Sequence, residues 1–257
     1  MLSGERDLNP PPSVWETDAL PDELSPLVLG SAFGGLAGEL LPLFKEHKKV
    51  TMNLAIIKYN AGNIQSVLNA LERLGFQAEV TDDAERIKAA DKVIFPGVGE
   101  ARSAMKSLQQ NNLDQLIKEL KQPVLGICVG MQLLCKHSEE NDTDCLGIVP
   151  IQVKRFFTTP LSISNEEEPE VRFKIPQVGW NNIYDLRSAL FVDIDDNSFI
   201  YNVHSYYAED SDYTIAKCNY GIEYAAAIRK DNFYGVQFHT EKSAETGDQI
   251  IQNFLEL

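Results

Sequence analysis

The chain has 257 residues, of which 44% are hydrophobic, and a formal net charge of −15 at pH 7. A chain of this length can bury a sizeable core, either as one domain or as one domain with an appendage. The acidic charge argues against a nucleic-acid partner, because binding phosphates requires clustered Lys and Arg side chains. No run of about 18 apolar residues occurs, so no membrane-spanning helix is expected.

Four cysteines and four histidines are scattered along the chain without the C-x-x-C spacing of a zinc site. We therefore predict neither a bound metal nor a cofactor. Reduced thiols are typical of proteins in the cytoplasm, and cytoplasmic is the localisation that we predict.

Residues 1–51 differ in character from the rest of the chain. They contain six of the twelve prolines and an apolar stretch, 27–44, that keeps neither a helical nor a strand period. Eight acidic residues outnumber four basic ones, whereas a signal peptide places basic residues before its apolar stretch. We predict that 1–51 is an extension outside the fold, poorly ordered or an upstream reading-frame artefact, and that one domain spans 52–257.

From Met52 onward, strand-like and helix-like patterns alternate along the chain. Strands that alternate with helices favour a parallel sheet covered by helices. Strands are predicted at 53–59, 77–81, 92–97 and 123–128, and helices at 64–74, at about 84–90 and at about 100–121.

The second half of the chain is rich in strands separated by hairpin-like breaks, and residues 247–257 predict a closing helix. We therefore predict an α/β fold in which a mostly parallel central sheet is flanked by helices, with added antiparallel strands in the second half. The acidic stretch 164–170 is expected to be a solvated loop.

The sequence PVLGICVGMQLLC places Cys128 between Gly126 and Gly130. Glycines on both sides remove Cβ atoms that would keep a strand and a helix apart, so the thiol can occupy a tight, exposed turn. At a helix N-terminus the macrodipole favours the thiolate, and the N–H of Val129 is free to stabilise an oxyanion. The alternative is that Cys128 is a small buried hydrophobe, as we expect for Cys135 inside the following helix.

A cysteine nucleophile needs a base, and the base needs a group that orients it. The sequence YGVQFHTEKS near the C-terminus offers His239 as the base and Glu241 as its partner. Taken alone, His239 could equally be a surface histidine at a strand end, and Glu241 a solvated charge. His137 is expected to be exposed, and His204 to be packed or hydrogen-bonded in the middle of a strand.

The sequence FPGVGEA, residues 95–101, follows a predicted strand. Gly97 and Gly99 form a loop that can turn its amides toward a neighbouring strand end, so the N–H of Val98 is a candidate second oxyanion donor. Glycine-rich loops after strands are common, and this one lacks the spacing of a dinucleotide-binding or Walker sequence.

Together these residues resemble the class I, or triad, glutamine amidotransferases, and the resemblance covers essentially all of 52–257. The sequence GICVGMQ is similar to the nucleophile elbow of that family, with Gln132 where the family helps to hold the substrate glutamine. His239 and Glu241 match the other two triad members. Within the family, YNAGNIQSV, PGVGEA, PQVGWN, HSYY and HTEKS are most similar to the glutaminase subunit of imidazole glycerol phosphate synthase.

The resemblance implies a division of labour between two subunits of a heterodimer. It implies that Cys128 attacks the carboxamide of L-glutamine, that His239 passes the proton to the leaving ammonia, and that water releases glutamate from the thioester. The ammonia would enter a cyclase (β/α)8 barrel, which makes imidazole glycerol phosphate and the aminoimidazole carboxamide ribonucleotide AICAR in histidine biosynthesis.

Further roles are implied by the resemblance alone. Backbone groups around Ser205 and Tyr206 would bind the amino-acid end of glutamine. Four side chains would lie on the face toward the barrel, where Lys242 would pair with an acidic residue; without the resemblance each of them has an ordinary structural interpretation. The four are Asn60, Asn63, Trp180 and Lys242.

The chain departs from the family at one position of the triad segment. The family usually has proline between the catalytic histidine and glutamate, and this chain has Thr240. Losing a proline that fits its site costs about 0.4–1 kcal/mol through greater freedom of the unfolded chain. The reacting groups remain, so we expect an active but slower enzyme. The extension 1–51 is a second departure.

Three alternatives stay open. The glutaminase of pyridoxal phosphate synthase shares the triad but carries a Ser/Thr-rich segment after its glycine loop, which GVGEARSAM does not supply. A stand-alone cysteine-triad hydrolase could use the same elbow without a partner face. The third alternative is an inactive interaction subunit, and the intact triad argues against it.

Overall fold

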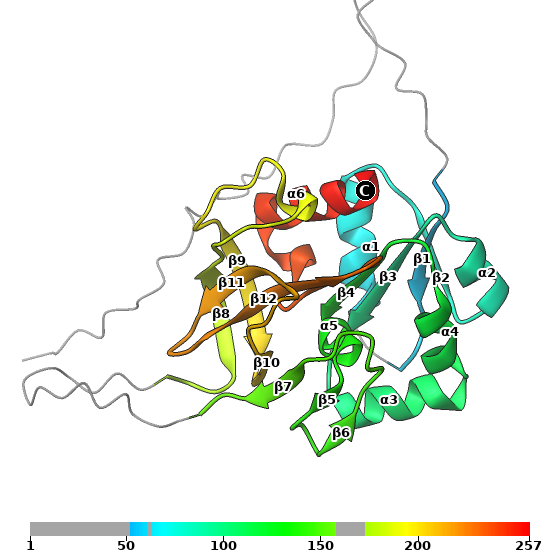
Figure 1. Ribbon diagram of the computed structural model, residues 1–257. Helices are drawn as coiled ribbons and strands as arrows, with labels where there is room; N and C mark the ends of the chain where they lie inside the picture. Colours follow the sequence, from blue (N-terminus) through cyan, green and yellow to red (C-terminus); the bar gives the residue numbers. More distant parts are fainter. Residues whose placement is uncertain (1–51, 61–62, 158–172) are drawn as a thin grey trace, which may run out of the picture. The chain divides into compact units, whose positions relative to one another are not determined.

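The computed structural model describes residues 52–60, 63–157 and 173–257 (Figure 1). The predictions for the extension 1–51 and the acidic stretch 164–170 lie outside the described residues and stay predictions. Within the described part of the chain, no helix is both long and apolar enough to cross a membrane.

The first half of the domain alternates strand and helix, and each strand lies within its predicted range. The elements are β1 (Leu54–Ile57), α1 (Ile64–Arg73), β2 (Ala78–Thr81), α2 (Ala84–Ala89), β3 (Lys92–Gly97), α3 (Ala101–Gln110), α4 (Leu113–Glu119), β4 (Val124–Cys128) and α5 (Val129–Leu134). The single helix predicted at about 100–121 is wrong, because α3 and α4 are separate. Asn112 between them has a φ of 55°, a left-handed conformation that a right-handed helix does not accommodate.

The second half is built mainly of strands. They are β5 (His137–Ser138), β6 (Thr143–Asp144), β7 (Gln152–Arg155), β8 (Gln177–Asn182), β9 (Phe199–His204), β10 (Tyr206–Ala208), β11 (Thr214–Asn219), β12 (Glu223–Lys230) and β13 (Phe233–Val236). Two 3-10 turns, η1 (Ala189–Phe191) and η2 (Thr240–Lys242), precede the closing helix α6 (Ala244–Glu256), which starts earlier than predicted.

Most strands of the described chain form one sheet. Its order is β2-β1-β3-β4-β13-β12-β10-β7-β5-β6, with β11 paired to β12. Neighbours from β2 to β13 run parallel, whereas β12 is antiparallel to β13, β10 and β11. The predicted α/β fold, with a parallel centre and added antiparallel strands, is confirmed. A separate antiparallel pair joins β8 to β9.

The direction of winding reverses between β1 and β3. The chain steps from β1 to β2 in one direction and from β3 to β4 in the other, so right-handed crossovers place α1 on one face of the sheet and α3 with α4 on the other (Figure 1). Loops that leave adjacent strands toward opposite faces open a crevice at the carboxyl ends of those strands. The segments that follow β1, β3 and β4 therefore meet at one edge of the sheet.

The strands under this edge are buried along their whole length. Every residue of β1, β3 and β4 is buried, which explains why these strands are apolar in the sequence apart from Lys92 at the start of β3. Side chains at the ends of such strands are held by a core that has little freedom to move.

Candidate active site

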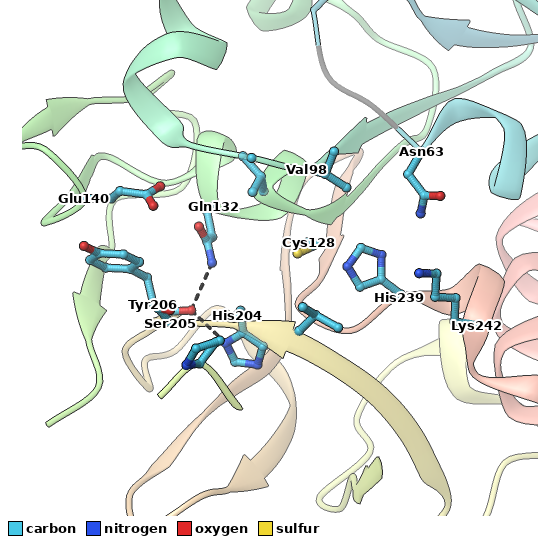
Figure 2. Close-up of a pocket in the computed structure, with 14 residues that line it drawn as sticks. Asn63, Val98, Cys128, Gln132, Glu140, His204, Ser205, Tyr206, His239 and Lys242 are labelled. Carbon is cyan, nitrogen blue, oxygen red and sulfur yellow. Dashed lines mark hydrogen bonds between the residues drawn. The ribbon is translucent and has the colours of Figure 1, made fainter. Parts of the chain in front are cut away.

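A pocket of about 490 Å³ opens where β3 and β4 end (Figure 2). Cys128 and His239, which are far apart in the sequence, both line it. The lining residues are Asn63, Val98, Gly99, Cys128, Val129, Gln132, Glu140, Pro176, Val203, His204, Ser205, Tyr206, His239 and Lys242. Three of the predicted site residues do not line the pocket: Glu241, Asn60 and Trp180.

Cys128 occupies the tight strand-to-helix turn that its glycines predicted. It ends β4 with φ 53° and ψ −111°, a conformation that is rare for a residue with a side chain. A Cβ on Gly130 would lie 1.9 Å from the carbonyl oxygen of Phe95, and one on Gly126 would lie 2.9 Å from the backbone of Gly130. Backbone contact between β3, β4 and α5 therefore requires glycine at both positions.

Cys135 follows this turn and provides a comparison with Cys128. It is the residue directly after α5, so the prediction that it lies inside the helix is wrong by one position. Its predicted burial is confirmed, with 0% of its surface exposed. Burial raises the pKa of the Cys135 thiol, whereas Cys128 faces the pocket.

His239 and Glu241 form a buried hydrogen-bonded pair. The imidazole Nδ1 lies 2.7 Å from Oε1 of Glu241, and the backbone N–H of His239 donates to the carbonyl of Tyr201 in β9. Burial by itself lowers the pKa of His239, but the neighbouring Cys128 and Glu241 outweigh it and raise the pKa to about 10. A histidine held in this way can stay positively charged beside a thiolate.

The carboxylate of Glu241 is held from two sides. Its Oε1 accepts hydrogen bonds from His239 and from Nδ2 of Asn63, which lies just before α1. Its Oε2 is buried and has no hydrogen-bond partner among the described residues, and neither has Oγ1 of Thr240 next to it. Asn63, predicted to face a partner, is therefore also tied to the triad.

The two predicted oxyanion donors, Val98 and Val129, both line the pocket. Val129 is the first residue of α5, so its N–H has no acceptor within that helix. Val98 follows Gly97, where an added Cβ would lie 2.4 Å from the N atom of Gly130. On the other side of Val98, Gly99 has a φ of 92° and open space around it.

The strand end at Ser205 and Tyr206 is fixed by two side chains. The carbonyl of Tyr206 accepts a hydrogen bond from Nε2 of Gln132 at 3.0 Å and lies 2.8 Å from Nδ1 of His204. Burial lowers the pKa of His204 to about 4, so the ring is neutral at pH 7 and donates from Nδ1. His204 is the last residue of β9, not a mid-strand residue, and its predicted packed, hydrogen-bonded state is confirmed.

Glu140 lines the pocket and was not predicted as a site residue. It accepts a hydrogen bond from the N–H of Ala101 at 2.7 Å, and burial raises its pKa. The sequence signal was only a pair of acids after a helix, which is typical of a solvated surface. The fold turns this acid toward the pocket because β5 and β6 lie beside the start of α3 (Figure 1).

The remaining predicted residues lie near the mouth of the pocket or beside it. Lys242 is exposed and lines the pocket, and Asn60 is exposed with its N–H donating to Oγ of Ser107. Trp180 is partly exposed on β8. Within the described residues, no group of three His, Cys, Asp or Glu side chains could hold a metal ion.

Comparison with known proteins agrees with this geometry. The family model for class-I glutamine amidotransferases matches residues 55–257. The chain is 54% identical over 206 residues to the imidazole glycerol phosphate synthase subunit HisH of Bacteroides fragilis, a match that covers 80% of this chain and 100% of that protein. The chain belongs to this family. It is a glutamine amidotransferase, and its HisH-type subfamily is the glutaminase side of imidazole glycerol phosphate synthase in histidine biosynthesis.

Other relatives carry the same name. HisH of Bacteroides thetaiotaomicron is 50% identical, with 80% of this chain and 100% of that protein covered. HisH of Idiomarina loihiensis is 45% identical, with 80% and 98% covered. Among solved structures, a glutamine amidotransferase shares the fold with a TM-score of 0.57 at 16% identity, covering 79% of this chain and 97% of that one.

Proposed function

We propose that Cys128, His239 and Glu241 hydrolyse L-glutamine to glutamate and ammonia, and that this chain delivers the ammonia to a cyclase subunit. The observation that carries the proposal is that His239, hydrogen-bonded to Glu241, lines the same pocket as the strained Cys128. Nucleophile, base and orienting carboxylate follow one another in the order that acyl transfer requires.

The reaction has two halves. The thiolate of Cys128 attacks the carboxamide carbon of glutamine, and protonated His239 gives a proton to the leaving nitrogen, so ammonia departs and a thioester remains. Neutral His239 then takes a proton from water, whose oxygen attacks the thioester; glutamate leaves and the thiolate returns. Both tetrahedral intermediates carry an oxyanion, which the N–H groups of Val98 and Val129 would stabilise.

The amino-acid end of glutamine needs charged and polar partners. The carboxylate of Glu140 lines the pocket and suits the α-ammonium group of the substrate. Gln132 holds the carbonyl of Tyr206, which already has two donors, so the remaining backbone groups of Ser205 and Tyr206 would face the α-carboxylate. Gln132 would therefore contribute by fixing this strand end as well as by contacting substrate.

An apolar face beside the pocket supports a protein partner. Val178 pairs with Val203 and Trp180 with Tyr201, so the four side chains share one face of the β8–β9 sheet. Val178 is 57% exposed and Val203, which also lines the pocket, is 38% exposed. Exposed apolar patches of this kind mark protein interaction sites.

The partner that fits the subfamily is a cyclase (β/α)8 barrel. Ammonia made at Cys128 would pass into the barrel and yield imidazole glycerol phosphate and AICAR. Lys242, exposed at the rim of the pocket, would pair with an acidic barrel residue, and Asn60, Asn63 and Trp180 would contact the same surface. An ordinary structural role for each remains the alternative.

The decisive experiment measures glutamate release from glutamine by the full chain. The assay is run alone and with a cognate cyclase plus its nucleotide ligand, with Cys128→Ala as the blank. We expect strong stimulation by the liganded partner that disappears in the blank. Full activity without the partner would instead favour a stand-alone hydrolase, and absence of thioester and glutamate in both settings would favour an interaction subunit.

A further inference from the structure

Tyr59 is a buried polar residue that the triad mechanism does not use. It lies just after β1, is 7% exposed, and packs its ring against Phe95 with the centroids 5.4 Å apart. Its hydroxyl donates a hydrogen bond of 2.7 Å to the carbonyl oxygen of Pro96. It does not line the pocket, yet Pro96 lies two residues before the predicted oxyanion donor Val98.

The hydroxyl of Tyr59 has a single proton, and the bond to Pro96 occupies it. Burial, reinforced by the negative charge of Cys128, raises the pKa of Tyr59 well above its usual value, so the proton stays in place. The phenol therefore cannot donate to the thiolate or to a substrate at the same time. Its influence on the site has to act through the loop that it holds.

The loop at the end of β3, residues 97–100, is closely packed at Gly97 and has open space at Gly99. The carbonyl of Pro96 belongs to the planar peptide unit that extends to the Cα of Gly97, so holding that oxygen fixes the plane. A Cβ on Gly97 would lie 2.9 Å from the hydroxyl of Tyr59 and 2.4 Å from the N atom of Gly130, whereas Gly99 has no atom within 4 Å of that position. The N–H of Val98 lies between the two glycines.

A second contact ties the same segment to the far end of the loop. The N–H of Asn60 donates to Oγ of Ser107 in α3, and α3 begins at Ala101 directly after the loop. Residues 59 and 60 thus reach both the start of the loop and the helix that follows it. Between these two anchors, the peptide that carries the Val98 N–H turns about the ψ bond of Gly97 and the φ bond of Val98.

We propose that Tyr59 is a positioning residue for the oxyanion loop, residues 97–100. By holding the carbonyl of Pro96 it fixes the peptide plane that precedes this loop, and so sets the direction in which the N–H of Val98 points. This inference rests on the proposed function for its effect on turnover. Its effect on the motion of the loop does not depend on that function.

The test compares Tyr59→Phe with Tyr220→Phe. Tyr220 is the control, because its hydroxyl also donates to a backbone carbonyl, that of Lys174, at 2.9 Å, although this bond is exposed and neither residue lines the pocket. In the full complex with liganded cyclase, loss of one buried hydrogen bond in Tyr59→Phe should lower kcat for glutamate release about fivefold. KM for glutamine should change less than about twofold, because an oxyanion donor acts in the transition state.

Amide hydrogen exchange supplies a measurement that does not need activity. In Tyr59→Phe the amides of 97–100 should exchange faster than in the wild type, while Tyr220→Phe leaves them unchanged. Unaltered exchange and kcat in Tyr59→Phe would overturn the proposal, as would equal changes in both variants or a parallel change of kcat and KM. A wild-type complex that releases no glutamate, with exchange accelerated only in Tyr59→Phe, would overturn the proposed function and leave the positioning role standing.

Discussion

The nucleophile side and the histidine side of the pocket are held in place by different forces. Around Cys128 the backbones of β3, β4 and α5 touch, and a single added methyl at Gly130 would lie 1.9 Å from a carbonyl oxygen. Around His239 the geometry depends on hydrogen bonds that join Glu241 and Asn63. Atoms in steric contact cannot move closer together at any reasonable cost in energy. A hydrogen bond, by contrast, stabilises a position by a few kcal/mol at most, so the position can be lost when the bond is removed.

The largest expected effect is a loss of stability when a side chain is added at Gly130, next to the nucleophile. Gly130→Ala should lower the free energy of unfolding by about 4 kcal/mol or more, because two backbones must separate. Gly75→Ala is the control: φ is 82° but no atom lies within 4 Å of the new Cβ, so we expect a loss of about 1–2 kcal/mol. Urea unfolding curves measure both, and equal losses would contradict the steric account.

On the histidine side the fold should survive and catalysis should fail. Glu241→Gln keeps the shape but removes the charge that orients His239, so we expect kcat to fall by roughly 10³–10⁴. Glu245→Gln, in the exposed first turn of α6, is the control and should leave kcat unchanged. An active Glu241→Gln enzyme would remove Glu241 from the mechanism.

The pH dependence of stability distinguishes the two histidines of the pocket. Burial lowers the pKa of His204 to about 4, so its contribution to stability is present above the unfolded value of 6.5 and is lost as pH falls toward 4. A shift of this size corresponds to about 3 kcal/mol. The raised pKa of His239 has the opposite sign, since its contribution is lost as pH rises toward 10.

Unfolding free energies measured from pH 7 to pH 4 test this assignment. The loss over that range should be smaller by about 3 kcal/mol in His204→Asn, which cannot titrate. The same slope in His204→Asn and in the wild type would show that other groups carry the acid sensitivity.

A smaller effect is expected where only one of two hydrogen bonds is removed. Asn63→Ala leaves Glu241 with His239 as its partner, so kcat should fall about tenfold, within the range of one bond to a charged group. Asn69→Ala, at an exposed position of α1, is the matched control. If Asn63→Ala changed only the affinity for the cyclase, Asn63 would be an interface residue and not a support of the triad.

The smallest effect concerns Thr240, where the family usually has proline. The residue opens η2, and proline is tolerated in the first turn of a helix because its missing N–H has no helical acceptor. Thr240→Pro should raise stability by about 0.4–1 kcal/mol and increase turnover modestly. Thr240→Val removes a hydroxyl that is buried without a partner and should also stabilise the fold. Unchanged turnover in Thr240→Pro would contradict the prediction that Thr240 slows the enzyme.

The sequence by itself determined the features that depend on residues close together along the chain, such as the strands and the turn at Cys128. The alternation of strand-like and helix-like patterns from Met52 onward predicted a parallel sheet, because parallel strands need a crossover connection between them, usually a helix. The glycines around Cys128 predicted the turn, because close approach of backbones excludes Cβ atoms. The break between α3 and α4 was missed, since Asn112 tolerates both helical and left-handed backbone.

Only the tertiary structure decided which distant groups meet. Glu140 looked like a surface acid until β5 and β6 brought it to the pocket, and Asn63 was predicted only to face a partner until its amide reached Glu241. The bond from Tyr59 to Pro96 likewise joins the segment after β1 to β3, at the point where the winding reverses. Such pairs leave no local pattern, because a hydrogen bond between side chains far apart in sequence depends on the path of the chain and not on spacing.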